Sequence, residues 1–280
     1  EGVSAYPAEV TGMMVRGFVT GHAGINVLSR HAGIDVQVVD MGCSADFQDL
    51  VAAGSIVDAK IARGTANMRR EPAMSREQAL LAITRGAEIA RKAALAGYRM
   101  LGTGDMGIGN TTPSAAIAAV ATGRPVRELT GRGTGVDDAG LARKQTVIEQ
   151  SIQERRPDPR DPLDILSKVG GFEIGGIAGL ILGAAQSRIP VVIDGVISTA
   201  GAVIAWLLDQ RVGGYMFAAH RSVEPAQSAM LAMMRLEPIL DLGMRLGEGT
   251  GCAVAMPIIE AGAKVISQMA TFAEAGVPQG

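Results

Sequence analysis

A glycine-rich segment at residues 102–112 combines one carboxylate with several amide and hydroxyl side chains. It contains four glycines, at Gly102, Gly104, Gly107 and Gly109. These allow tight turns and close approach of the backbone to a ligand. An apolar run precedes the segment and an Ala-rich helix follows it, with Thr111 or Thr112 placed as the N-cap and Pro113 in the first turn. Such a loop directs free N–H groups and the positive end of a helix at an anion, typically phosphate, although a tight turn without a ligand would use the same glycines.

Other polar and glycine-rich segments also follow predicted strands or helices. They are Asp40, Gly131–Gly135, Asp194, His220–Ser222 and the loop Leu246–Gly251, which carries Glu248. Ligands of parallel α/β folds bind outside the carboxyl ends of the strands. We therefore predict one composite site built from Asp40, Gly131–Gly135, Asp194, His220–Ser222 and the Asp105 loop. For Asp40, capping of the following loop is an equally consistent interpretation, and His220 is predicted to be a hydrogen-bonded structural residue rather than a metal ligand.

Strands and helices are predicted to alternate along the chain. The expected strands cover 35–41, 98–101, 189–194 and 214–219, with a further one at 55–62. The expected helices cover 9–32 (with a break near Gly21 and Gly24), 75–96, 114–121, 139–155, a segment starting at 161, 172–187, 198–209, 223–234 and 252–273. Capping signals at Ser75, Asp137 and Asp161 support three of the helix starts. The pattern predicts an α/β fold, with a parallel Rossmann-like sheet covered by helices on both faces.

Composition excludes several other classes of protein. The chain has 280 residues, enough for one large or two modest domains, and its 28 acidic residues nearly balance its 26 basic ones. The chain therefore has no basic footprint for nucleic acid. No uninterrupted apolar run approaches the ~20 residues of a membrane span. Cys43 and Cys252 are too few for a disulfide framework or a thiolate metal site, which favours a reducing cytoplasm.

Four motifs in order along the chain resemble the nicotinate-nucleotide–dimethylbenzimidazole phosphoribosyltransferase family of cobalamin biosynthesis. They are Gly104–Thr112, Gly131–Gly135, Ser167–Glu173 and Arg245–Gly251, and the segments Glu1–Pro7 and Asn26–Arg30 fit as well. The resemblance covers essentially the whole chain. The family begins earlier than Glu1, so we expect that an N-terminal portion is missing here. The resemblance also implies that residues 1–250 form the α/β catalytic domain and that 251–280 add a C-terminal helix to a small helical subdomain.

The resemblance implies transfer of 5-phosphoribose from nicotinate mononucleotide to 5,6-dimethylbenzimidazole or a related base. The pyridinium leaving group needs no acid, whereas the attacking benzimidazole must lose a proton, so one general base is the main requirement. By resemblance that base is Glu248. A turn carboxylate bonded to nearby N–H groups is the alternative interpretation of this residue. No metal and no cofactor are expected.

The resemblance also assigns the binding residues. The nucleotide phosphate and ribose correspond to Asp105, Gly107, Gly109, Asn110, Thr111, Thr112, Gly133, Lys144 and Ser222, and the base pocket to Tyr6, Met14 and Leu246. Many family members have Glu at the position of Asp105, whose shorter side chain could alter its contact. Without the resemblance, Lys144 would be interpreted as a solvated surface residue.

Two other functions are consistent with parts of the sequence. Gly102-x-Gly104-x-x-Gly107 after a strand is also a weak signal for an NAD-dependent oxidoreductase. A non-catalytic nucleotide-binding homologue is the other alternative. Long Ala- and Met-rich helices, with Met230, Met233, Met234 and the 244–269 region, together with the family resemblance, favour a homodimer.

Overall fold

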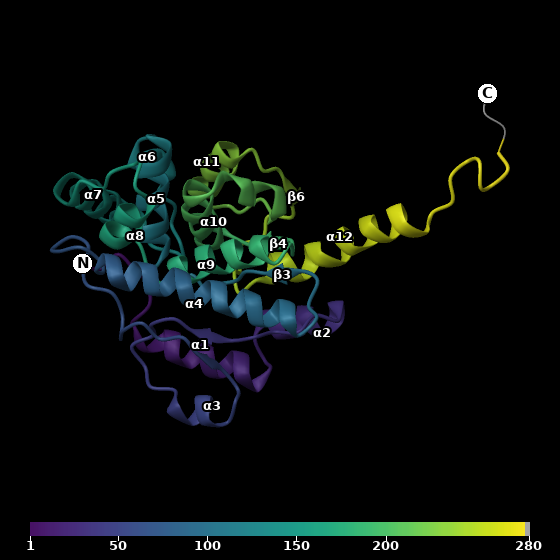
Figure 1. The fold of residues 1–280 in the computed structure, drawn as a ribbon. Helices are drawn as coiled ribbons and strands as arrows, with labels where there is room; N and C mark the ends of the chain where they lie inside the picture. Colours follow the sequence, from purple (N-terminus) through teal and green to yellow (C-terminus); the bar gives the residue numbers. More distant parts are fainter. Residues whose placement is uncertain (278–280) are drawn as a thin grey trace.

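The computed structural model describes residues 1–277, and its chain alternates between helices and short strands (Figure 1). The helices are α1 (Glu9–Thr20), α2 (Gly24–Ala32), α3 (Gln48–Ala52), α4 (Arg76–Leu95), α5 (Thr111–Thr122), α6 (Val126–Leu129), α7 (Asp138–Arg155), α8 (Pro162–Val169), α9 (Phe172–Gln186), α10 (Val196–Leu208), α11 (Pro225–Met234) and α12 (Thr250–Gln268), with a 3-10 helix at Gln210–Tyr215. The strands are β1 (Val39–Asp40), β2 (Val57–Asp58), β3 (Leu101–Gly102), β4 (Val191–Ile193), β5 (Met216–His220) and β6 (Pro238–Leu240).

A four-stranded parallel sheet in the order β3-β4-β5-β6 forms the centre of the fold. β4 is apolar and fully buried, as expected for a parallel strand covered on both faces. Helices α9 and α10 pack on β4, and α12 packs on β4 and β5. Helices α4 and α5 lie outside α9 and α10, and α2 lies against α12. The predicted fold class, a parallel sheet flanked by helices, is confirmed.

The segment predicted as a strand over 35–41 does not join this sheet. Only Val39 and Asp40 are extended in register, and they pair with Val57 and Asp58 in a separate two-stranded parallel sheet. The Asp40 carboxylate accepts hydrogen bonds from the N–H groups of Gly42 and Cys43 and pairs with Lys60 at 3.0 Å. Asp40 thus caps its own loop, and its inclusion in the composite site was wrong.

Several helices begin at the capping residues predicted from the sequence, and one begins at a different residue. Ser75 and Gln78 form the predicted capping box at α4, and Asp137 accepts from Gly140 N–H at the start of α7. The break after Thr20 separates α1 from α2 as predicted. The N-cap of α5, however, is Asn110 rather than Thr111 or Thr112.

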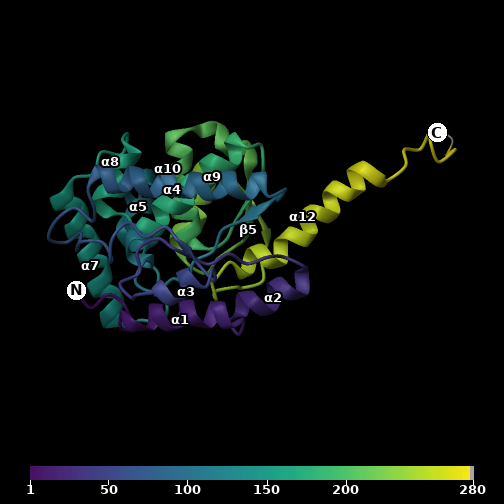
Figure 2. The same ribbon diagram turned by 60° about the horizontal axis from the view of Figure 1, so that its bottom comes forward.

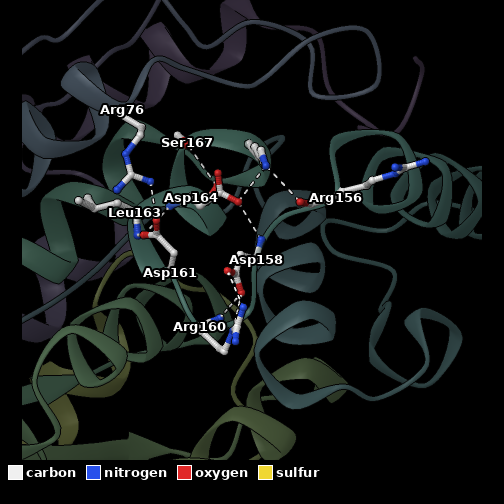
Figure 3. A network of polar contacts seen from close by, with 9 residues as sticks. Arg76, Arg156, Asp158, Arg160, Asp161, Leu163, Asp164 and Ser167 are labelled. Carbon is white, nitrogen blue, oxygen red and sulfur yellow. Dashed lines mark hydrogen bonds and ion pairs between the residues drawn. The ribbon is translucent and has the colours of Figure 1, made fainter.

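A polar network joins the starts of α4 and α8 (Figure 3). The Asp161 carboxylate accepts from the N–H groups of Leu163 and Asp164 and from Arg76 of α4 at 2.7 Å. The Asp164 carboxylate accepts from the Asp158 N–H and from Lys168. The cap at Asp161 therefore fixes α8 both locally and against α4.

The second half of α12 extends away from the body of the molecule (Figures 1 and 2). Its first turns, with Cys252, Ala255 and Met256, pack against Val192 and Ala219 of the sheet, whereas Val265 and Ile266 are 52% and 88% exposed. Among the described residues α12 alone is long and apolar enough, by length and composition, to cross a membrane, and a core helix passes the same test. The boundary at residue 250 coincides with the start of α12. The division into two domains stays a prediction, and 278–280 lie outside the described residues.

Helices α4 and α9 approach so closely that glycines are required where they touch. A Cβ atom on Gly86 would lie 1.9 Å from the carbonyl oxygen of Gly176, and one on Gly179 would lie 1.8 Å from that of Ile83. Because both obstacles are backbone atoms, no side-chain rotation can relieve the overlap. The two helices would have to move apart.

We expect Gly86→Ala to lower the free energy of unfolding by about 2–4 kcal/mol, the scale of overpacking in a rigid core. Gly17→Ala in α1 is the matched control, since nothing lies within 4 Å of its added Cβ. It should raise stability by up to about 1 kcal/mol. Denaturant unfolding of the two variants measures both effects, and equal midpoints would contradict this description of the interface.

Candidate active site

A cavity of about 340 Å³ lies beyond the carboxyl ends of β4 and β5. It is lined by the Asp105–Gly107 loop, Thr111, the Gly133–Thr134 turn, the segment Asp194–Ser198, His220, Ser222–Glu224, the loop Arg245–Gly247 and Tyr6. These segments come from distant parts of the sequence and, apart from Tyr6, follow or begin secondary-structure elements. The predicted composite site is therefore assembled, with Asp40 outside it.

Glu248 lies on a loop with an unusual backbone. Three consecutive residues, Gly247, Glu248 and Gly249, have φ values of +78°, +63° and +86°. The left-handed region costs a residue with a side chain roughly 1–2 kcal/mol, so Glu248 is held there by its surroundings. Strain of this kind is concentrated at functional sites.

The Glu248 backbone and side chain have separate partners. Its N–H donates to the carbonyl oxygen of Asp105 at 2.8 Å, which joins its loop to the first glycine loop. Its Oε2 accepts from the N–H of Ile25, in the first turn of α2, at 3.0 Å. This hydrogen bond fixes the Glu248 carboxylate at the start of α2. The hydrogen bond is also the one expected of a turn carboxylate, and Oε1 has no hydrogen bond among residues 1–277.

Asp194, which directly follows β4, anchors this loop through its carboxylate. Its Oδ2 accepts from Gly249 N–H at 3.0 Å and its Oδ1 from Gly251 N–H at 2.9 Å. His220 Nε2 lies 3.3 Å from Oδ1. Burial alone would lower the pKa of His220, but the hydrogen bond and charge of Asp194 raise it above its usual value. His220 is thus a buried structural partner of Asp194, as predicted, and no group of three potential metal-binding residues occurs within the described part of the chain.

Residues with backbone and hydroxyl donors also line the cavity. Gly107, Thr111, Gly133 and Ser222, all predicted binding residues, line it directly. Lys144 lies immediately behind, 1% exposed, and its Nζ donates to Thr111 Oγ1 at 2.7 Å and to the carbonyl oxygen of Gly131 at 3.1 Å. Burial lowers the pKa of Lys144, and the negative charge of Glu224 opposes this. Without the family resemblance this lysine would be interpreted as a solvated surface residue, whereas the structure buries it beside Thr111.

Asn110 links two carboxyl groups beneath the first glycine loop. Its Nδ2 donates to Asp105 Oδ1 at 2.9 Å and to Glu173 Oε1 at 3.3 Å. Burial, and then the charge of Asp105, raises the pKa of Glu173 to about 7. Burial also raises the pKa of Asp105, while hydrogen bonds from Asn110 and the Gly107 N–H oppose the shift. Asn110 therefore links the first glycine loop to Glu173, in the first turn of α9, through hydrogen bonds.

The remaining predicted site residues divide into cavity-lining and peripheral positions. Tyr6 and Leu246 line the cavity and are 48% and 56% exposed. Met14, on α1, is partly buried and does not line it. Gly109 and Thr112 also lie outside the lining, with Thr112 buried in the first turn of α5.

Sequence reasoning missed several residues that line the cavity. They are Gly195, Val196, Ile197, Ser198, Val223 and Glu224. The strongest available signal was for Glu224, which follows a predicted strand end and precedes Pro225 at the start of a helix. Its carboxylate accepts from Gly133 N–H at 2.9 Å, a contact between residues 91 positions apart.

The raised pKa of Glu173 predicts a pH-dependent stability. A carboxyl group that ionises near 4.5 when unfolded and near 7 when folded binds protons more tightly in the folded state between these values. Stability should therefore fall as pH rises through that window and change no further above it. Glu173→Gln keeps an acceptor for Asn110 and cannot ionise, so its advantage over the wild type should grow by about 1–3 kcal/mol between pH 5 and pH 8.

Thermal unfolding at several pH values measures this difference. Glu88→Gln is the matched control, because Glu88 is exposed on α4 and its replacement removes the same charge. A Glu173→Gln difference that is as independent of pH as that of the control would contradict the buried carboxyl pair.

Comparisons with known proteins agree with this geometry. A family model described as "Phosphoribosyltransferase" matches residues 1–277. A nicotinate-nucleotide–dimethylbenzimidazole phosphoribosyltransferase of Geotalea uraniireducens (strain Rf4) is 58% identical over 280 residues, which are 100% of this chain and 79% of the relative. The protein of the same name from Roseiflexus sp. (strain RS-1) is 56% identical over 276 residues, 99% of this chain and 77% of the relative. A crystal structure of CobT from Thermus thermophilus superimposes with a TM-score of 0.94 at 42% identity, covering 100% of this chain and 82% of that one. This chain belongs to the nicotinate-nucleotide–dimethylbenzimidazole phosphoribosyltransferase family.

Proposed function

We propose that the chain transfers 5-phosphoribose from nicotinate mononucleotide to 5,6-dimethylbenzimidazole or a related base, giving α-ribazole 5′-phosphate and nicotinate. The observation that carries this proposal is the loop Gly247–Gly249. It carries one carboxylate, that of Glu248, on a strained backbone, and the Glu248 N–H bonds it to the first glycine loop at the Asp105 carbonyl oxygen. Gly247 lines the cavity, whereas Glu248 is not among the lining residues. The names of the relatives supply the two substrates.

Glu248 is the general base of the proposed reaction. One ring nitrogen of the benzimidazole attacks C1′ of the ribose while the bond from C1′ to the pyridinium nitrogen breaks. The electron pair of that bond returns to the ring nitrogen, so the pyridinium ring loses its positive charge and nicotinate leaves. The proton on the other ring nitrogen passes to the Glu248 carboxylate. Attack opposite the leaving group inverts the configuration at C1′ from β to α. The Ile25 N–H at the start of α2 supports this role because its hydrogen bond at 3.0 Å holds the Glu248 carboxylate in a defined position.

The backbone and hydroxyl donors that line the cavity would hold the nucleotide. Gly107, Thr111, Gly133 and Ser222 are the direct candidates for the phosphate and ribose, since they line the cavity. Lys144, whose Nζ donates to Thr111 Oγ1, would place a positive charge close to the bound phosphate. We infer that Asp105, Gly109, Asn110 and Thr112 shape the loop and the helix start around it.

The base would lie against Tyr6 and Leu246, which line the cavity, whereas Met14, on α1, is outside the lining. An apolar surface of this kind discriminates weakly, because one methyl group is worth only ~1–3 kcal/mol. We therefore expect related benzimidazoles to be accepted as well. A cytoplasmic location is supported by the two free cysteines, Cys43 and Cys252.

Replacing Glu248 with Gln should lower kcat about 100-fold or more, the usual scale for loss of a general base. Gln retains an oxygen for the Ile25 N–H, so the fold and the affinity for nicotinate mononucleotide should change little. Steady-state kinetics and calorimetry measure the two properties separately. A variant with normal kcat at neutral pH would remove Glu248 from the mechanism.

We further propose that the chain forms a homodimer through α12. Val265 and Ile266 of its projecting half are exposed, as is Met269 directly after it. Met230 and Met234, by contrast, are buried in the core of the chain and do not support a dimer interface. Light scattering at micromolar concentration should give twice 28.9 kDa. Ile266→Asp should shift this value toward the monomer, while Leu80→Asp, at an exposed position on α4, should not. A monomeric wild-type chain would refute the proposal.

A further inference from the structure

The Glu224 carboxylate points into the part of the cavity formed by the Gly131–Gly135 turn. Its Oε1 accepts from Gly133 N–H at 2.9 Å. Its Oε2 would lie 2.1 Å from a Cβ atom on Gly131, so both oxygens lie against the turn. Glu224 immediately precedes α11 and lines the cavity.

The surroundings of this carboxylate suit a more highly charged anion. Gly133 N–H and the Thr111 hydroxyl line the same cavity, with Lys144 Nζ 2.7 Å behind that hydroxyl. Nζ would lie 3.4 Å from a Cβ atom on Gly133. No carboxylate of the described residues lies within 4.0 Å of Nζ, so this buried cation has no ion-pair partner there. The glycine turn, the hydroxyl and the cation together form an anion site that Glu224 occupies.

We propose that Glu224 occupies the site of the nucleotide 5′-phosphate in the free chain, so that a phosphate-bearing ligand must displace its carboxylate to bind. This inference rests on the proposed function for the identity of the ligand. It makes Glu224 a residue that sets the affinity and the selectivity for phosphate, because it competes with the ligand for Gly133 N–H.

The side chain is held in a way that permits displacement. The Glu224 backbone N–H is bonded separately, to Ser222 Oγ at 3.2 Å, so the carboxylate can leave without disturbing the start of α11. Within residues 1–277 the carboxylate accepts a single hydrogen bond, from the Gly133 N–H. The same competition acts on the product, which carries the same phosphate. Return of the carboxylate to Gly133 therefore favours product release.

The test compares Glu224→Gln with Glu237→Gln. Gln keeps the size and an acceptor for Gly133 N–H but removes the negative charge, whereas Glu237 is exposed and outside the cavity. Calorimetry uses three probes: inorganic phosphate, nicotinate mononucleotide and nicotinate riboside, which lacks the phosphate. We expect Glu224→Gln to bind the first two roughly tenfold more tightly or better, since like charges in close contact oppose binding strongly. The riboside affinity, and all affinities of Glu237→Gln, should stay as in the wild type.

Glu224→Asp is a second variant that keeps the charge and shortens the arm. It should also tighten phosphate binding, by less than Glu224→Gln, because the shorter side chain reaches Gly133 poorly. Unchanged or weaker phosphate binding in Glu224→Gln would overturn the proposal, and weaker binding of the riboside as well would place Glu224 on the ribose. Phosphate binding can be measured without turnover. A wild-type chain that fails to transfer phosphoribose would therefore refute the proposed function, while the binding data for Glu224→Gln would still test the role of Glu224.

Discussion

The buried Asp194 carboxylate is the interaction on which the active-site architecture depends. It accepts from Gly249 and Gly251, and His220 lies 3.3 Å away, so it joins β4, β5 and the start of α12. Its own N–H donates to Thr103 Oγ1, which adds the segment after β3. Removal of one partner from such a buried pair typically costs about 3–5 kcal/mol, because the other charge is left uncompensated. Asp194 therefore fixes the loop that carries Glu248 relative to the sheet.

Contact between the two glycine loops follows from that constraint. A Cβ atom on Gly104 would lie 2.6 Å from Gly249 N, and one on Gly247 would lie 2.7 Å from the Asp105 carbonyl oxygen. The loops thus meet backbone to backbone, and neither can carry a side chain at these points. The proposed base and the proposed phosphate loop are consequently positioned as one unit. The left-handed backbone of Glu248 is the local cost of this arrangement.

Local signals explain why much of the fold could be predicted from the sequence. The capping residues Ser75, Asp137 and Asp161 act within three residues of themselves, so their helices begin where the sequence indicates. The register of short strands depends on distant partners, which is why the segment around Asp40 was assigned to the wrong sheet. The burial of Lys144 and the contact of Glu224 with Gly133 likewise arise only when α7, the glycine turn and α11 come together. The family motifs include the loops that line the cavity. The residues that bond to these loops come from distant parts of the sequence, so they can be identified only in the three-dimensional structure.

In the proposed reaction a single carboxylate allows inverting transfer of phosphoribose between two bases. NMR and mass spectrometry of the products that the purified chain forms from nicotinate mononucleotide and 5,6-dimethylbenzimidazole test this directly. We expect equal amounts of nicotinate and ribazole 5′-phosphate, with the α configuration at C1′. A β product, or release of nicotinate with ribose 5-phosphate in place of the nucleotide, would contradict it.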